Sequence, residues 1–428
     1  MRVRERRSST LALALAATLG AAVSAQTPAP MPRLTMDDAV RLALERNQTL
    51  RAQRLTIDES KADEITAGLK PNPSLSLGVD GLAVFSPSQI DFGFLSDSAQ
   101  YSAGLDYLFE RGGKREKRIA AAQNNTAVTS RNVVEAERQL RFQTQQAFVN
   151  VQLAKSNLDL AQQNLASFSN TVETSRARVT AGDLAEGDFL MVSLQKLQFE
   201  QDVSAAELSL VQSKASLRQF VGYGSVSEDF DIVGDMAHMK IAVTLDALKQ
   251  AALASRPDLQ AAQTGVTLAQ AQADLEISNR AQDVDGNVTY SRNAFGPISA
   301  IGAGVSFGLP IHNRNQGNIA HTKIAVEQAK ETEAATRATV LTDVSSAFAQ
   351  YQTNERVLTL FESGYLDQAK QSLDIATYVF QRGAGSLLSL LDAERTYRAT
   401  QVSYRQAVAA YLTSVFQLNF VAGRQVVQ

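Results

Sequence analysis

The chain has 428 residues, a formal net charge of −3 and no cysteine. The absence of cysteine excludes disulfides, a thiolate nucleophile and zinc–thiolate sites, and the nearly balanced charge gives no reason to expect a nucleic-acid partner. The sequence has three histidines, no phosphate-cradling glycine loop and no serine nucleophile motif. We therefore predict that it is not an enzyme and needs no cofactor.

Residues 1–25 have the pattern of a secretory signal peptide. Basic residues precede an apolar run from Leu11 to Val23, and Val23-Ser24-Ala25 forms a small-residue cleavage site. A membrane anchor is the alternative, but the run is shorter than the roughly 20 residues that span a bilayer. We therefore predict cleavage after Ala25, and no lipid anchor because no cysteine lies near the site. No later window is long and apolar enough for a transmembrane helix, so only strands could cross a membrane.

The rest of the sequence consists of two similar halves. Gly104–Ile119 aligns with Gly304–Ile319 without a gap, and each copy joins an alternating segment to a long helical one. Two further matches pair Leu34–Asp37 with Val243–Asp246, and Ala181-Gly182 with Arg382-Gly383. Tandem copies of this kind form one fold unit. We predict a first repeat at 26–220, an inter-repeat linker at 221–242, a second repeat at 243–420 and a C-terminal tail at 421–428.

Four short segments alternate with period two, as strands do. They are residues 73–84 and 99–109 in the first repeat, and residues 282–292 and 299–309 in the second. In the last segment Ile301 and Val305 lie on one face, and Gly302 and Ser306 on the other. An apolar face opposite a small or polar one is typical of a strand between lipid and a wet lumen. A soluble sheet with one wet face would give the same alternation.

The remaining segments predict helices. Residues 114–181 contain no proline and hold a heptad through Val151, Leu158 and Leu165, which predicts a supercoiled helix about 100 Å long. The second copy, at 318–381, changes register partway, and its two successive seams are Tyr351, Leu358, Tyr365 and then Leu366, Leu373, Phe380. Shorter helices are predicted at 36–70, 187–220, 245–279 and 386–420. Two of them stacked end to end match one long helix, so each half should form a two-stranded column.

A hairpin pair cannot span a bilayer alone, because its edges would leave backbone groups unpaired in hydrocarbon. Four strands per chain therefore require several copies, and a trimer gives twelve strands with room for a pore. We predict a mainly α fold with membrane β, in which each of two tandem repeats is a β-hairpin plus long coiled-coil helices. Three chains would form a twelve-stranded β-barrel continued by a periplasmic α-helical barrel.

The junction between strand and helix resembles that of a known family. Phe109–Glu116, with Pro71-Asn72-Pro73 ahead of the first strand and the paired glycine turns, resembles the TolC-like outer-membrane efflux proteins. It is most similar to their cobalt–zinc–cadmium efflux (CzcC-like) branch. The resemblance implies a homotrimeric, passive channel in the outer membrane that extends into the periplasm. There it would meet a periplasmic adaptor protein and an inner-membrane pump of the resistance-nodulation-division (RND) type.

The resemblance places the gate and the adaptor contacts at the tips of the helical hairpins. The adaptor contacts would be Arg178, Gly182, Arg382 and Gly383, and the gate positions would be Asp188, Asp392, Ser389 and Gly385. Three copies of Asp188 or Asp392 around an axis would form an anionic constriction that favours cations. The alternatives are that Asp188 caps a helix start and that Asp392 is a solvated helix residue. Ser389 and Gly385 stand where the family can have a second gate aspartate and an arginine lock, which argues against a salt-bridged gate.

Two further groups are weaker candidates. A basic cluster below the strands would bind lipid headgroups of the outer membrane or be a solvated helix start; it comprises Arg111, Lys114, Arg115, Lys117 and Arg118. Met236, His238 and Met239 in the linker have the ligand chemistry of a soft-metal site, although incidental methionine and histidine are commoner.

These patterns predict the exit duct of a tripartite RND-type efflux system for heavy-metal cations. A duct for drug efflux or type I secretion is the alternative of the same class. A periplasmic coiled-coil scaffold or adaptor is the alternative of another class.

Overall fold

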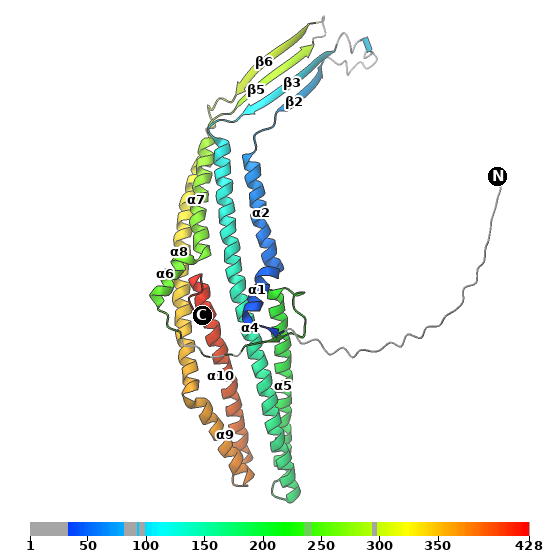
Figure 1. Cartoon of the computed structure of the whole chain (residues 1–428), viewed down its shortest axis with the longest axis vertical. Coiled ribbons are helices and arrows are strands. Elements are labelled where there is room, and N and C mark those ends of the chain that lie inside the picture. Colours follow the sequence, from blue (N-terminus) through cyan, green and yellow to red (C-terminus); the bar gives the residue numbers. More distant parts are fainter. Residues whose placement is uncertain are drawn as a thin grey trace, which may run out of the picture.

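The computed structural model describes residues 33–80, 92–93, 99–234, 236, 238, 241–292 and 298–427. Three predicted features lie outside these residues. They are the signal peptide with its cleavage site after Ala25, the end of the predicted strand 73–84 from residue 81 onward, and Met239. The described chain is an elongated column of helices with a four-stranded sheet at one end (Figure 1). Among the described helices, none is both long and apolar enough to cross a membrane.

Both halves have the same order of elements. The first contains α1 (Met36–Arg46), α2 (Gln48–Gly68), β2 (Ser74–Asp80), β3 (Gln100–Phe109), α4 (Lys114–Ala181) and α5 (Glu186–Val221). The second contains α6 (Leu245–Ser255), α7 (Pro257–Ser278), β5 (Val284–Arg292), β6 (Ser299–Phe307), α8 (Gln316–Leu360), the π turn η2 (Phe361–Tyr365), α9 (Leu366–Gln381) and α10 (Leu387–Ala422). A short parallel pair, β1 (Arg33–Leu34) with β4 (Asp231–Ile232), joins the first half to the linker. The predicted duplicated, mainly helical fold is confirmed.

The first helix of each half is broken, where the sequence predicted one continuous helix. Asn47 has an extended backbone; its N–H donates to Ala43 O and closes α1, while its Oδ1 accepts the Leu50 N–H of α2 at 3.0 Å. Arg256 holds the equivalent place in the second half, because the residue before a proline avoids the helical region and Pro257 can start a new helix. Each of these two predicted helices is therefore a pair.

The helices form four columns that lie side by side (Figure 1). Column one is α2 stacked on α5, column two is α4, column three is α7 stacked on α10, and column four is α8, η2 and α9; neighbouring columns pack in this order. Each column continues into one strand, in the order β2, β3, β5 and β6 across the sheet. Columns one and four are therefore the two edges of the array, just as β2 and β6 are the two edges of the sheet.

The sheet separates two kinds of side chain across all four strands. One row of the ladder consists of Leu75, Leu105, Val288 and Ala303. The next row, on the opposite face, consists of Ser76, Gly104, Thr289 and Gly302. The apolar face is open, since 76% of Leu77 and 81% of Ile301 are accessible. The alternation predicted strand by strand is therefore kept in register across the sheet.

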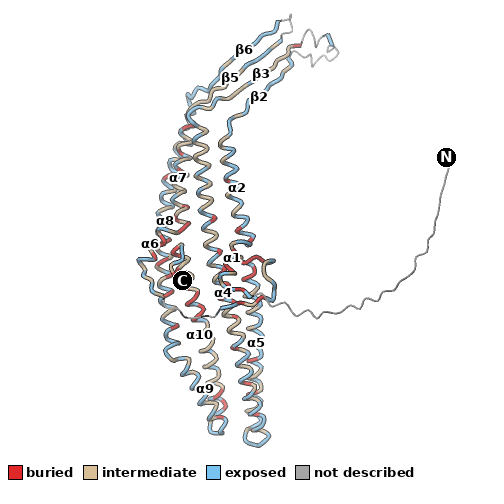
Figure 2. Tube along the Cα trace, viewed as in Figure 1, coloured by how far each residue is buried: buried red, intermediate tan, exposed pale blue. Residues whose placement is uncertain are grey.

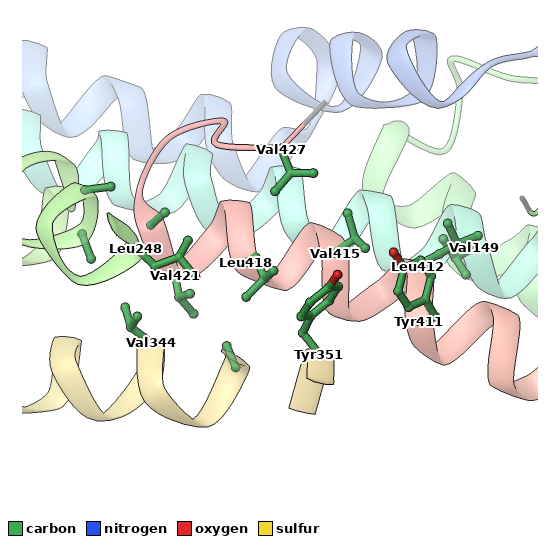
Figure 3. Packing of buried hydrophobic residues seen from close by; sticks show 14 of the residues in the cluster. Val149, Leu248, Val344, Tyr351, Tyr411, Leu412, Val415, Leu418, Val421 and Val427 are labelled. Carbon is green, nitrogen blue, oxygen red and sulfur yellow. The ribbon is translucent and has the colours of Figure 1, made fainter. Parts of the chain in front are cut away.

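Most buried residues lie near the middle of the column (Figure 2). One cluster joins α6, α8 and α10 around Leu248, Val344 and Tyr411, and Val149 of α4 belongs to it (Figure 3). A second cluster lies where α1, α4 and α5 meet, around Phe148. The two halves are thus packed together at mid-height, and the lower ends of the helices depend on a separate, smaller core.

Candidate functional site at the helical tips and column edges

The two helical tips reverse direction at glycines with positive φ. Gly182 has φ 83° and donates its N–H to Val179 O at 3.0 Å, after the end of α4. Gly383 has φ 74° and donates to Phe380 O at 2.9 Å, after the end of α9. This left-handed conformation is the one that ends helices with least strain at glycine. The predicted turn residues are therefore confirmed as turns.

Arg178 ties one tip to the other. Its Nη1 donates to the Phe380 carbonyl of α9 at 2.9 Å, its Nη2 donates to Asp183 O at 3.2 Å, and its guanidinium lies 5.0 Å from the centre of the Phe380 ring. Arg382 instead packs over Tyr378 of its own helix at 5.3 Å. Of the four predicted adaptor-contact residues, Arg178 and Gly383 thus lie together, and Arg178 already holds a structural contact between the hairpins.

The gate candidates on the second tip share one groove. Gly385, Ser389 and Asp392 line a groove of about 480 Å³ between α9 and α10. A Cβ on Gly385 would approach the Phe380 amide nitrogen to 3.1 Å, so this position does not accept an arginine lock without rearrangement. Ser389 is held by Ser386, which caps the start of α10. Only Asp392 presents a charge to the groove.

The two gate aspartates differ in their surroundings. Asp392 is exposed and forms an ion pair with Arg395, one turn further on, at 2.7 Å. Asp188 lies in the first turn of α5, where a negative charge is favourable. The N-cap of that helix is Ala185, with no side-chain cap hydrogen bond, so the alternative that Asp188 itself caps the helix is wrong. The structure places Asp188 on one hairpin and Asp392 on the other.

The four columns share a small core just above the tips. Phe168 of α4, Phe199 of α5, Phe380 of α9 and Leu390 of α10 are nearly fully buried in it. A flat row of four columns could not bury one side chain from each column in one core. The lower end of the array is therefore folded into a bundle.

One ion pair crosses this bundle between columns that are not neighbours. Arg398 Nη1 of α10 lies 2.7 Å from Asp202 Oδ2 of α5, and its guanidinium lies 4.8 Å from the centre of the Phe199 ring. We call Asp202 and Arg398 the tip brace. Sequence reasoning missed it, because helical periodicity does not tell which charged residues face each other from two helices 196 residues apart.

Most side chains of the predicted basic cluster bind other groups of the same chain. Arg115 donates to Gly68 O at 2.5 Å, which satisfies the C-terminal end of α2. Lys114 pairs with Asp283 at 2.8 Å. The other contacts are Arg118 with Glu110, Ala67 O and Leu69 O, and Lys117 with Asp274. Within this five-residue cluster, which the structure describes in full, Arg111 alone is both exposed and without an ion pair.

Asp283 also ends the sheet. Its carboxylate accepts the backbone N–H of Arg111 at 3.0 Å, so the ladder stops at the pair of Val284 and Phe307. The strands predicted at 282–292 and 299–309 are therefore two residues shorter at this end.

The two linker candidates that the structure describes, Met236 and His238, both contact other parts of the chain. His238 Nδ1 lies 2.9 Å from Glu362 Oε2 of η2, and the His238 ring meets the edge of Tyr411 at 4.8 Å. Met236 packs against the mid-height core. Within the described part of the chain, no group of three or more His, Cys, Asp or Glu residues is placed to hold a metal ion.

Both edges of the column array expose apolar side chains at matching heights. On α5, Leu208 and Val211 stand 22 and 25 residues from the helix start at Glu186. On column four, Leu360 and Val357 stand 21 and 24 residues from the end of α9 at Gln381. A lower set also matches, namely Leu190 and Leu194 on α5 with Tyr378 and Ile375 on α9. The two hairpins end at similar levels (Figure 1), so the two edges are complementary in height.

Comparisons with known proteins agree with this geometry. The family described as "Outer membrane efflux protein" matches residues 39–223 and 248–424. The cobalt-zinc-cadmium resistance protein CzcC of Cupriavidus metallidurans is 22% identical over 392 residues, covering 91% of this chain and 90% of CzcC. The cation efflux system protein CusC of Escherichia coli K12 is 24% identical over 399 residues, covering 84% of this chain and 80% of CusC.

The fold is also that of a solved channel. The open state of the Neisseria gonorrhoeae MtrE outer membrane channel matches with a TM-score of 0.74 at 18% identity, covering 91% of this chain and 89% of MtrE. The chain therefore belongs to the outer membrane efflux protein family, whose members are channels and not enzymes.

Proposed function

We propose that three copies of this chain form the outer-membrane exit duct of a tripartite efflux system for heavy-metal cations. The duct would cross the outer membrane through its strands and extend into the periplasm through its helices. Its partners would be a periplasmic adaptor protein and an inner-membrane RND pump, which supplies the energy. The gate would lie at the helical tips, with Asp188 and Asp392 facing the permeating cations.

The observation that carries this proposal is the continuity of each column with one strand of an open sheet. Within the described residues, β2 and β6 each pair on one side only, and the sheet's apolar face is exposed. Unpaired strand edges are not tolerated in hydrocarbon. Further copies that pair β6 with β2 would remove both edges, and three copies would give twelve strands, enough for a pore.

The helical edges support the same closure. If β6 of one copy pairs with β2 of the next, column four of the first lies beside column one of the second. Leu360 and Val357 would then lie at the same height as Leu208 and Val211 of the neighbouring copy. Such a head-to-tail interface generates a closed ring when the rotation fits.

The cargo is inferred from the relatives and from the tip. CzcC is named for cobalt, zinc and cadmium resistance and CusC for cation efflux. Acidic side chains at a constriction favour cations, and Asp392 is the one charged residue of the groove that it shares with Ser389 and Gly385.

Deleting the gene and measuring sensitivity tests the cargo. We expect lower tolerance of zinc, cobalt or cadmium, restored by the plasmid-borne gene, and unchanged tolerance of dyes and detergents. Sensitivity to dyes with normal metal tolerance would support the drug-efflux alternative instead. Recovery of the protein as a soluble periplasmic monomer would support the scaffold alternative.

Cross-linking between copies tests the closure. The chain has no native cysteine, so Leu208→Cys with Leu360→Cys and a bifunctional maleimide should give covalent dimers and trimers in membranes. The matched control keeps Leu208→Cys and places the second cysteine at Ile324, on the same column but far above. Equal cross-linking of both pairs, or none with the first pair, would refute the proposed edge contact.

A further inference from the structure

The segments that contain the two long helices differ by one residue between aligned positions of the sequence, and the break in the second helix lies at η2. The aligned strand glycines, Gly104 and Gly304, are 200 positions apart, whereas the aligned tip glycines, Gly182 and Gly383, are 201 apart. The second copy therefore contains one residue more than the first between its strand glycine and its tip glycine. The helix α4 runs unbroken for 68 residues, but its counterpart is interrupted at Phe361–Tyr365. A break of this kind, at which Gly364 leaves the helical conformation, accommodates one extra residue.

The register change in the sequence has the same cause. Leu358 is fully buried and Tyr365 is 57% exposed, so the seam that was predicted to reach Tyr365 leaves the core after Leu358. The next buried position of the lower seam is Phe380, with Leu373 packed beside it. The lower part of column four is thus turned by one residue relative to the upper part, and this rotation directs Phe380 into the tip core.

The turn also has a non-helical backbone at Gly364 and free space beside it. Gly364 has φ 117° and ψ 0° within the turn, a conformation that residues with a side chain rarely adopt. A groove of about 520 Å³, lined by Leu360, Tyr365 and Thr396 among others, lies between this segment and α10. A backbone break with room on one side is a place where a helix can bend.

The inter-repeat linker holds this turn. His238 comes from the linker, and its Nδ1 lies 2.9 Å from the Glu362 carboxylate of η2. The His238 side chain is 12% exposed and its ring packs edge-on against Tyr411 of α10. The contact therefore connects the turn to the mid-height core, which does not depend on the tips. No equivalent contact to a broken helix exists on α4, since α4 is continuous.

We propose that η2 is a hinge that positions the gate and that His238, through Glu362, is the latch that restrains it. This inference rests on the proposed function, because it assigns the regulation of the same tip. With the latch closed, the lower part of column four stays in the orientation that keeps Phe380 in the tip core. With the latch released, α9 can swing about Gly364 and carry its end of the gate with it.

Two kinds of variant have opposite expected effects on gating in planar bilayers. His238→Phe keeps a ring against Tyr411 and loses the hydrogen bond, so switching between conductance levels should rise by roughly three- to tenfold, the factor of one net hydrogen bond. Glu362→Ala, which also removes the hydrogen bond, should act in the same direction. Deleting Gly364 removes the extra residue and makes Leu358, Leu366, Leu373 and Phe380 one continuous heptad seam. That variant should fold and assemble, yet switch at least tenfold less often than the wild type.

The controls separate the hinge from the channel itself. Lys330→Gln removes an ion pair within α8 on the same column, and its switching should equal that of the wild type. Thermal unfolding of the Gly364 deletion should show no loss of stability, since the tip seam is retained. If the wild type does not conduct at all, the proposed function fails. If the wild type conducts and the deletion variant switches like it, the hinge is refuted while the channel stands.

Discussion

The tip brace provides a quantitative prediction about the gate. Arg398→Gln removes both the ion pair with Asp202 and the contact of the guanidinium with the Phe199 ring. Because the brace joins columns one and three across column two, its loss should loosen the bundle at the level of the tips. We expect the channel to spend a larger fraction of time in its conducting state.

The size of the effect follows from the exposure of the two side chains. Arg398 is 22% and Asp202 36% exposed, which places their ion pair among partly solvated pairs worth roughly 0.2–1 kcal/mol. The contact with Phe199 adds about 0.5–1 kcal/mol. The total is about 1–1.5 kcal/mol per copy, equivalent to a five- to tenfold change in an equilibrium constant. Asp202→Asn removes the ion pair alone and should change the equilibrium by only about twofold.

Single-channel recording of the purified variants measures this effect. The open fraction should increase in the order Lys196→Gln, Asp202→Asn and Arg398→Gln. Lys196→Gln is the matched control. It breaks an ion pair with Glu200 inside α5 and removes no contact between columns. The exchanged pair Asp202→Arg with Arg398→Asp should restore part of the closed state. An open fraction unchanged by Arg398→Gln, or equal effects of all three single variants, would refute the reasoning.

Three further predictions concern stability and selectivity. Gly112→Ala should lower the free energy of unfolding by about 2–3 kcal/mol, because φ is +77° and the new Cβ would lie 2.7 Å from Ala281 Cβ. A Cβ at Gly182 meets no atom within 4 Å. Gly182→Ala should therefore lower the free energy of unfolding by clearly less in the same denaturant titration. Burial raises the pKa of the Glu394 carboxyl, so the folded state binds more protons than the unfolded one and stability should fall as pH rises through the folded pKa. Glu394→Gln should flatten that dependence in melts from pH 4 to 7, and an unchanged profile would contradict it. Asp392→Ala should lower cation selectivity measured from reversal potentials, whereas identical reversal potentials would return Asp392 to a solvated surface residue.

Sequence periodicity predicted the elements well, because each depends on local spacing. Alternation located all four strands, and the unbroken heptad of α4 located a helix that the structure describes over 68 residues. The breaks at Asn47 and Arg256 were missed, although an asparagine cap and a proline at a helix start are local signals that could have revealed them. The end of the ladder at Val284 could not be found locally, because it depends on Asp283 contacting another strand end.

The site was less predictable than the fold. The tip glycines were identified from the repeat, but the use of Arg178 to hold Phe380 and the pairing of Asp202 with Arg398 depend on which helix faces which. The π turn left a trace in the sequence, since the heptad shift and the one-residue difference between copies both mark it. Neither of these sequence features indicated that His238 would contact the turn, because the linker has no periodicity from which its path could be predicted.

The central claim is that copies of this chain close into a passive conduit, and conductance of the purified protein tests it most directly. The full mature protein, extracted in detergent and added to a planar bilayer without nucleotide or pump, should produce discrete, ohmic steps that favour cations over anions. A protein that keeps its helical circular dichroism and inserts into the bilayer, yet carries no current at any voltage, would contradict the account.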